Sequence, residues 1–188
     1  MADLNPASIP LSLYIHMPWC VRKCPYCDFN SHAVPDGKLS LDLEQEYLQA
    51  LVEDLKIQVD FAQGRHIHSV FIGGGTPSLI SANGYQWLFT QLKSLIPFED
   101  GCEITLEANP GTVEHDPFAG YLDAGINRLS IGVQSFNTDH LKKLGRIHSN
   151  ADAVNAIHLA KEAGFARVNV DLMHGLPEQS LEQALYDL

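Results

Sequence analysis

Short runs of aliphatic and β-branched residues alternate along this chain with longer segments whose apolar residues recur at helical spacing. The short runs predict strands at 11–16, 68–75, 102–111, 127–136 and 166–177. The longer segments predict helices at 41–61, 83–96, 116–124, 139–144, 150–163 and 180–188, with Ser40 as the N-cap of the first. Strands that alternate with helices in this way predict an α/β fold with a parallel sheet, either an open doubly wound sheet or a barrel.

The ends of the predicted strands favour the barrel. Each strand runs at its carboxyl side into an unusual segment, namely the cysteine loop, "GGGTP", "EANPG", "GVQSF" and "MHGLP". A parallel barrel gathers these ends on one face, whereas a doubly wound sheet concentrates its site at one switch point. The last residues fall inside what would be a sixth repeat. We therefore expect a tail at 1–10 and a core at 11–188, a partial (β/α)6 barrel truncated after about five β/α units.

Three cysteines lie within eight positions in "HMPWCVRKCPYCDFNSH", which covers residues 16–32. Cys20, Cys24 and Cys27 have the spacing C-x3-C-x2-C, and the fourth cysteine of the chain, Cys102, lies far away in an apolar run. A lone cysteine in such a run is typical of a small buried hydrophobic residue. The cluster, in contrast, is typical of a metal site if the thiols stay reduced.

Charge and hydropathy narrow the possible partners and the compartment. The 12 basic and 23 acidic side chains give a net charge of −11, which argues against a nucleic-acid partner. No apolar run approaches the roughly 20 residues that a membrane span needs. The N-terminal "MADLNPASIP" lacks the features of a secretory signal. We therefore expect a cytoplasmic protein with reduced thiols and no transmembrane segment.

Two kinds of metal site fit the cysteine spacing. A [4Fe–4S] cube takes four thiolates when fully ligated, so three cysteines leave one iron open to a small molecule. The alternative is structural zinc, with His16 or His32 as the fourth ligand. Zinc ligands usually come as two pairs separated by a dozen or more residues, and the sequence has no second pair. We favour the iron–sulfur interpretation.

The motifs as a set resemble a known superfamily. "YIHMPWCVRKCPYCDFNSH" and "FIGGGTPSLI" are similar to radical S-adenosylmethionine proteins. "LEANPGT", "NRLSIGVQSF", "LGRIH" and "NVDLMHGLP" resemble the oxygen-independent coproporphyrinogen III dehydrogenase (oxidase) family and, within it, a branch of haem chaperones. The resemblance implies a [4Fe–4S] cluster on the three cysteines, whose open iron binds the amino and carboxylate groups of S-adenosylmethionine. It also implies reductive cleavage of that cofactor to a 5′-deoxyadenosyl radical.

The resemblance assigns the glycine loop to the cofactor. Gly74, Gly75 and Thr76 match the positions that receive the methionine amino group. Because glycine has no Cβ, such a loop lets the backbone approach a ligand closely. A tight turn without function is the alternative.

Polar residues end three otherwise apolar strands. Glu107, Gln134 and Asp171 lie where an unpaired polar group in a barrel is costly, which favours a ligand or a partner. Carboxylates suit ribose hydroxyls because both of their oxygens accept. A salt bridge at the barrel rim between Asp171 and Arg128 is the alternative.

Three further residues are placed at the site by the resemblance. Arg146 matches a position at the methionine end of the cofactor, where a guanidinium can pair with a carboxylate. Tyr14 and Tyr26 match positions beside the cluster and the adenine. Without the resemblance, the arginine fits a solvated helix surface and the tyrosines fit ordinary packing.

The family divides into two functions. In the decarboxylating enzymes of the resembled family the motif reads C-x3-C-x2-C-x-C, and here Phe29 occupies the last cysteine position. This departure favours a chaperone that transfers haem to an acceptor protein over an enzyme acting on coproporphyrinogen III. The haem-binding motif of the chaperone branch, a histidine–asparagine pair followed by tyrosine–tryptophan, does not occur in this sequence. We expect the chain to bind the cluster and S-adenosylmethionine, and haem binding to need residues outside it. A zinc-stabilised barrel without redox chemistry is a third interpretation.

Overall fold

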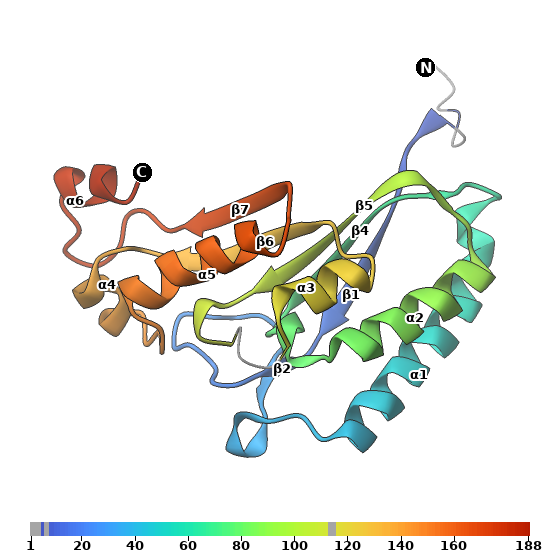
Figure 1. The fold of residues 1–188 in the computed structure, drawn as a ribbon, viewed down its shortest axis with the longest axis horizontal. Coiled ribbons are helices and arrows are strands. Elements are labelled where there is room, and N and C mark those ends of the chain that lie inside the picture. Colours follow the sequence, from blue (N-terminus) through green and yellow to red (C-terminus); the bar gives the residue numbers. More distant parts are fainter. Residues whose placement is uncertain (1–4, 6–7, 113–115) are drawn as a thin grey trace.

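The computed structural model describes residues 5, 8–112 and 116–188, except the side chains of Asp36 and Thr112. Its main sheet consists of five parallel strands, shown in Figure 1. They are β1 (Leu11–Met17), β4 (Ile67–Gly74), β5 (Phe98–Ala108), β6 (Arg128–Gln134) and β7 (Arg167–Leu172). The spatial order β1-β4-β5-β6-β7 follows the sequence without reversal. A doubly wound sheet reverses its strand order, so the fold is the predicted partial barrel.

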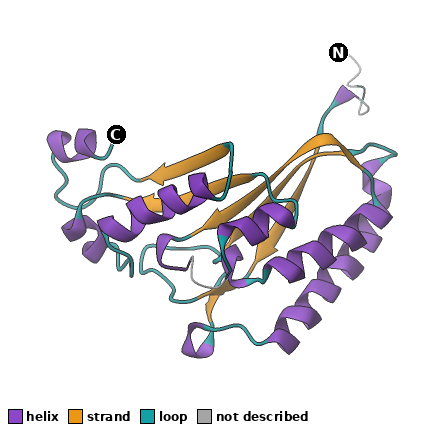
Figure 2. Cartoon of the chain, viewed as in Figure 1, coloured by secondary structure: helices purple, strands orange, loops and turns teal. Residues whose placement is uncertain are grey.

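Helices lie in each connection between successive strands of the main sheet, and one more helix follows the last strand, as Figure 2 shows. They are α1 (Leu41–Gln58), α2 (Ala82–Leu95), α3 (Phe118–Asp123), α4 (Thr138–Lys143), α5 (Asn150–Glu162) and α6 (Leu181–Tyr186). All eleven elements predicted from the sequence are present, although β5 begins at Phe98 rather than at residue 102. Ser40 caps α1 as predicted, because its side chain accepts from the Leu43 amide.

One small feature was not predicted. Within the cysteine loop, β2 (Trp19–Cys20) pairs with β3 (His32–Ala33) in a separate two-stranded sheet. Strands of two residues are too short to show an alternating pattern, so the sequence gives no signal for them. The pairing closes the loop that carries the cysteines.

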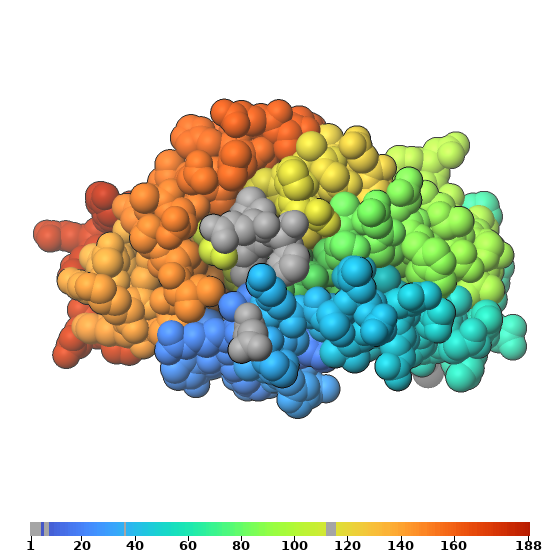
Figure 3. All heavy atoms as spheres, turned by 60° about the horizontal axis from the view of Figure 1, so that its bottom comes forward, coloured from blue at the N-terminus to red at the C-terminus, as the bar shows by residue number. Residues whose placement is uncertain are grey.

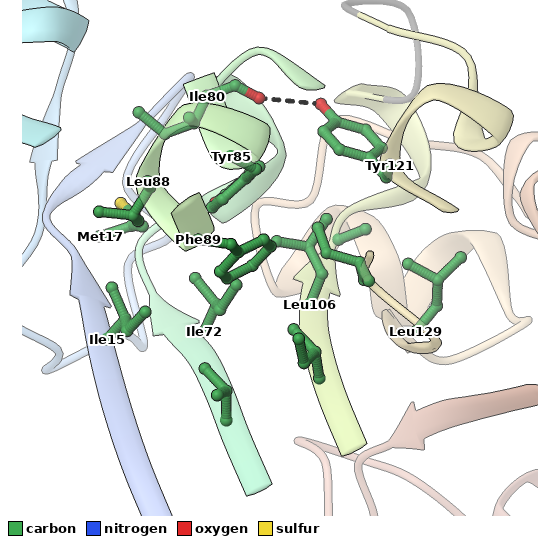
Figure 4. Close-up of a cluster of buried hydrophobic side chains, with 14 of the residues drawn as sticks. Ile15, Met17, Ile72, Ile80, Tyr85, Leu88, Phe89, Leu106, Tyr121 and Leu129 are labelled. Carbon is green, nitrogen blue, oxygen red and sulfur yellow. Dashed lines mark hydrogen bonds between the residues drawn. The ribbon is translucent and has the colours of Figure 1, made fainter. Parts of the chain in front are cut away.

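The hydrophobic core lies between the sheet and the helices that cover it (Figure 4). Alternate residues along the strands are buried on this face, including Ile15, Ile72 and Leu106. Figure 4 also shows the hydroxyl of Tyr121 donating to the carbonyl of Ile80 at 3.1 Å. Cys102 belongs to this core, which confirms the prediction that it is a buried hydrophobic residue.

The residues between the buried ones project from the other face of the sheet. Because side chains alternate along a strand, Glu107 lies on the face opposite Leu106, and Ser130 lies on the face opposite Leu129. Glu107 and Ser130 are register partners on neighbouring strands. This second face is polar, and it forms one wall of the site described next.

Candidate functional site

A cavity of about 340 Å³ opens at the carboxyl ends of the strands. Figure 3 shows the face of the molecule on which the blue cysteine-loop region meets the orange segment between α4 and α5. These two segments touch, since a guanidinium nitrogen of Arg146 lies 3.8 Å from the sulfur of Cys24. The predicted site residues that line the cavity are Cys20, Cys24, Tyr26, Cys27, Gly74, Gly75, Thr76, Glu107, Gln134, Arg146 and Asp171.

The three clustered thiols are free and all face this cavity. Backbone hydrogen bonds shape their loop: the Cys27 amide donates to the Cys24 carbonyl at 3.1 Å, and the Val34 amide to the Cys20 carbonyl at 2.9 Å. Among the residues that the structure describes, no three His, Cys, Asp or Glu side chains converge on a single ion-sized point. Phe29 also lines the cavity, with 57% of its surface exposed.

His16 connects strand β1 to the cysteine loop. Its Nε2 lies 2.8 Å from the Asn30 carbonyl, which can only accept, so Nε2 carries the proton. Its Nδ1 then accepts from the Tyr14 hydroxyl at 2.9 Å. Both nitrogens are therefore engaged, which leaves this histidine without a lone pair for zinc. Tyr14 itself is 57% exposed, stacks on Phe71 and, alone among the predicted site residues, does not line the cavity.

The glycine loop is fixed against the start of the cysteine loop. The Gly75 amide donates to the Met17 carbonyl, and the Thr76 amide donates to the Trp19 carbonyl, each at 2.6 Å. A Cβ on Gly75 would lie 2.3 Å from the Trp19 carbonyl oxygen, a distance that real structures do not show. Only glycine permits this approach, so the loop requires glycine here for its geometry.

Two acidic residues line the floor of the cavity. Glu107 accepts from the Gly74 amide at 3.2 Å, and its pKa is raised, mainly by burial. The carboxylate of Asp171 accepts from the Ser130 hydroxyl at 3.0 Å and from the Asn169 amide at 2.7 Å. Partly buried carboxyl groups with such polar partners could accept further hydrogen bonds from ligand hydroxyls.

The alternative of an Asp171–Arg128 salt bridge is wrong. The Arg128 guanidinium pairs with Glu103 at 4.0 Å and donates to the Thr105 hydroxyl at 3.2 Å. Arg128 and Asp171 lie on different strands and at different heights along the sheet, because Arg128 is in register with Arg167 rather than with Asp171. Sequence proximity to a strand end does not reveal this difference in register.

Arg146 links three parts of the site. Its guanidinium donates to the Asn109 side chain and to the Gly132 carbonyl, and it reaches Cys24 as described above. Asn109 in turn donates to the Thr76 hydroxyl at 3.2 Å. The Nε of Arg146 is buried and has no hydrogen-bond partner in the described part of the chain. A buried guanidinium N–H without a partner is costly, and a ligand or water with an acceptor atom would satisfy it.

Gln134 ends β6 in a left-handed conformation, with φ of 70°. This conformation is uncommon for a residue other than glycine and clusters at functional sites. Its carbonyl accepts from the Met173 amide at 2.8 Å, which joins the ends of β6 and β7. The turn in the backbone places Gln134 at the cavity wall.

Sequence reasoning missed three residues at this site. Asn109 bridges the glycine loop to Arg146, Ser130 supports Asp171, and His148 lines the cavity beside Arg146. Asn109 and His148 stand in the motifs "EANPG" and "LGRIH", so the signal was present in the sequence. Asparagine and histidine also occur commonly in structural roles, and only their contacts in the fold distinguish a structural role from a place in a binding site.

No helix in the described ranges is both long and apolar enough to cross a membrane. Comparison with curated proteins finds the heme chaperone HemW of Haemophilus influenzae, 57% identical over 183 residues that cover 97% of this chain and 48% of the relative. HemW of Escherichia coli is 56% identical over 95% of this chain and 46% of its own length. The chain thus spans about half the length of these relatives.

Among solved structures, coproporphyrinogen III oxidase HemN of Escherichia coli, described as a radical SAM enzyme, matches with a TM-score of 0.82. The identity is 31%, over 97% of this chain and 41% of HemN. The family model of the Radical SAM superfamily matches residues 14–188, almost the whole chain. Membership of this superfamily implies an iron–sulfur cluster and S-adenosylmethionine as cofactors. The cavity with its three thiols lies inside the matched region, and the chain belongs to the radical SAM superfamily.

Proposed function

We propose that Cys20, Cys24 and Cys27 hold a [4Fe–4S] cluster whose open iron takes S-adenosylmethionine. The observation that carries this proposal is that the three free thiols share one cavity with Arg146, whose Nε is buried and has no hydrogen-bond partner among the described residues. The thiol donors suit iron–sulfur ligation, and the guanidinium beside them favours a site for negative charge. When bound, the reduced cluster supplies one electron to the sulfonium of S-adenosylmethionine.

The other cavity residues bind and orient the cofactor in this proposal. The loop Gly74–Thr76 faces the methionine amino group, and the guanidinium of Arg146 faces the methionine end. Three polar side chains at the strand ends, those of Glu107, Gln134 and Asp171, hydrogen-bond the ribose and the methionyl moiety. Support for this assignment comes from the cavity, which gathers these residues at one end of the sheet.

Tyr26 and Tyr14 have different parts in this arrangement. Tyr26 lines the cavity beside Arg146, and burial raises its pKa, so it stays protonated and can pack against the cluster and the adenine. Tyr14 stands outside the cavity lining, and its hydroxyl donates to Nδ1 of His16. We propose that Tyr14 flanks the site from the polar face of the sheet.

The whole protein is proposed to be a haem chaperone of the HemW type, which transfers haem to an acceptor protein in the cytoplasm. Residues 11–188 form its radical SAM core, following a tail at 1–10, and haem contacts lie outside this core. The similarity to two proteins named as heme chaperones supports this assignment. A reducing compartment would also keep the clustered thiols available for iron.

Oxidative decarboxylation of coproporphyrinogen III is the second candidate function. The likeness to HemN, a coproporphyrinogen III oxidase, favours it. Phe29, at the position of the additional cysteine in the decarboxylating branch, argues against it. Its side chain lines the cavity, where the apolar ring would take up space and could not ligate a metal.

Anaerobic reconstitution with iron and sulfide tests the cluster. Wild type should retain four irons per chain on the [4Fe–4S] assignment, and Cys20→Ala, Cys24→Ala and Cys27→Ala should each lose most of this iron. Cys102→Ala is the matched control, because this thiol is buried in the core and should leave the iron content unchanged. Addition of S-adenosylmethionine should change the EPR spectrum of the reduced cluster. Stoichiometric zinc with no retained iron would refute the proposal.

A further inference from the structure

His148 lies between α4 and α5 and lines the cavity, but the proposed function assigns it no contact with the cofactor. The residue is only 5% exposed, and its Nε2 lies 3.0 Å from the Val133 carbonyl oxygen. Because a carbonyl only accepts, Nε2 carries the proton and donates. The Nδ1 of the same ring is buried without a hydrogen-bond partner among the described residues. A buried ring nitrogen without a hydrogen-bond partner costs free energy, and ordinary core side chains do not carry this cost.

The strand that His148 contacts is irregular at this point. The pairing of β6 with β5 stops at Ile131, opposite Ala108. On the other side, Ile131 pairs with Val170 and Gln134 with Leu172, so β6 advances three residues while β7 advances two. The end of β6 therefore contains an extra residue, as in a β-bulge, and such bulges re-aim side chains next to active sites.

Side chains of the segment between α4 and α5 donate hydrogen bonds to the backbone carbonyls at this irregular end of β6. The Gly132 carbonyl accepts from Arg146, and the next carbonyl, that of Val133, accepts from His148. Gln134 follows directly, in its left-handed conformation. Two side chains of one segment thus hold two consecutive carbonyls immediately before a strained residue of the cavity wall.

We propose that His148 is a positioning residue: its Nε2–H holds the Val133 carbonyl and so keeps Gln134 turned toward the cavity with Arg146 beside it. This inference rests on the proposed S-adenosylmethionine site, in which Gln134 and Arg146 contact the cofactor. His148 acts through these two residues. This role needs a proton on Nε2, which the neutral ring carries in one of its two tautomers.

The surroundings of the ring favour that form. Burial and the nearby Arg146 guanidinium lower the pKa of His148 to about 4, and the Val133 carbonyl and Asp152 only partly oppose them. The ring is therefore neutral at pH 7. With Nε2 bound to a carbonyl, one tautomer predominates, and nitrogen-15 NMR of labelled histidine can identify it.

Substitutions that remove or keep the donor test the role. His148→Leu removes it, whereas His148→Gln places an amide nitrogen near the position of Nε2. We expect the leucine variant of the anaerobically reconstituted protein to bind S-adenosylmethionine about three- to tenfold more weakly, as for one lost hydrogen bond. The glutamine variant should recover most of the affinity. His148→Asn, too short to reach Val133, repeats the test if the leucine variant does not fold.

Two comparisons separate positioning from general stability. Ser149→Ala removes the capping box of α5 next to His148, so it should lower the melting temperature but leave cofactor affinity unchanged. In a Gln134→Ala background, His148→Leu should reduce the cofactor affinity less than it does in wild type. The reason is that the Gln134 side chain, which His148 is proposed to position, is already absent.

The possible failures are distinguishable. If wild type binds S-adenosylmethionine and His148→Leu binds it equally well, the inference is wrong and the proposed function stands. An affinity loss of the same size in Ser149→Ala would show that His148 is only structural, and would also overturn the inference. If wild type itself binds no S-adenosylmethionine, the proposed function fails, and the positioning role fails with it.

Discussion

At the scale of single residues, the cavity depends on a few polar side chains with several partners each. Arg146 donates to Asn109 and to the Gly132 carbonyl and lies against Cys24, so one guanidinium connects three segments that are far apart in the sequence. A lysine ammonium is a single point of charge and cannot reproduce this planar set of donors. The consequences of replacing Arg146 should therefore be large.

We predict that Arg146→Ala and Arg146→Lys both weaken S-adenosylmethionine binding by about 10- to 100-fold, roughly 1.5–3 kcal/mol for a lost charged hydrogen bond. Equilibrium dialysis of the reconstituted protein measures the effect. Lys142→Ala is the matched control, because its side chain is 73% exposed on the neighbouring helix. If Arg146→Ala and Glu107→Ala both bind as wild type does, the cofactor does not lie where we propose.

We also predict an effect of pH on stability through His148. Burial and the Arg146 guanidinium lower its pKa from 6.5 to about 4 in the folded chain. As the pH falls below 6.5, the unfolded chain binds a proton that the folded chain does not, so folding stability falls until both forms are protonated near pH 4. The loss is at most roughly 3 kcal/mol. It should be smaller in His148→Gln, as measured by urea unfolding between pH 7 and pH 4.

His158→Gln serves as the control for this pH effect, because His158 is exposed on α5. Its stability should follow pH as wild type does. Identical pH profiles for His148→Gln and wild type would contradict the prediction.

At the scale of elements, the helices are fixed by buried polar contacts as well as by the core. Glu44 of α1 is 7% exposed, and its carboxylate accepts from the Ser81 amide at 3.0 Å and the Ser81 hydroxyl at 2.6 Å. The same hydroxyl accepts from the Gly84 amide at 2.9 Å and caps α2. One carboxylate therefore holds the start of the next helix, directly after the glycine loop.

We predict that Glu44→Ala lowers the free energy of unfolding by about 1–3 kcal/mol, because it leaves the partly buried Ser81 amide without its acceptor. Glu46→Ala, at an exposed position of the same helix, should change it by less than about 0.5 kcal/mol. Urea unfolding of both variants measures the difference. Equal stabilities would show that the contact between α1 and the cap of α2 contributes nothing.

At the scale of the whole molecule, the partial barrel has a helix-covered apolar face and a polar face that leads to the cavity. The chain spans about half the length of its curated relatives, so haem handling is a property to test on the longer protein. In both candidate functions the barrel would supply the cofactor site that we propose. What separates the functions is the occupant of the polar face and the residue at position 29.

We predict that the longer protein, reconstituted anaerobically, binds haem saturably and does not decarboxylate coproporphyrinogen III. The physical reason is that Phe29 places an apolar ring in the cavity where the enzyme branch has a further thiol. A haem titration run beside an anaerobic turnover assay provides the measurement. Turnover at about 1 s⁻¹ or faster without saturable haem binding would assign the protein to the enzymes instead.

The sequence by itself determined the elements and the chemistry of the donors. Strand and helix positions follow from the local periodicity of apolar residues, and Ser40 was identified as a cap because capping involves neighbours in the chain. The cysteine spacing and the strand-end motifs likewise lie within short segments, so the superfamily could be inferred before the fold was known.

Only the tertiary structure decided which partners the site residues take. Asp171 pairs with Ser130 instead of Arg128 because the register of β6 against β7 decides which residues meet. The irregular end of β6, and with it the contact of His148, depends on strand pairing that leaves no local signal. Such contacts join residues 15 and 41 positions apart, and their geometry is fixed only when the sheet and the loops around it have packed together.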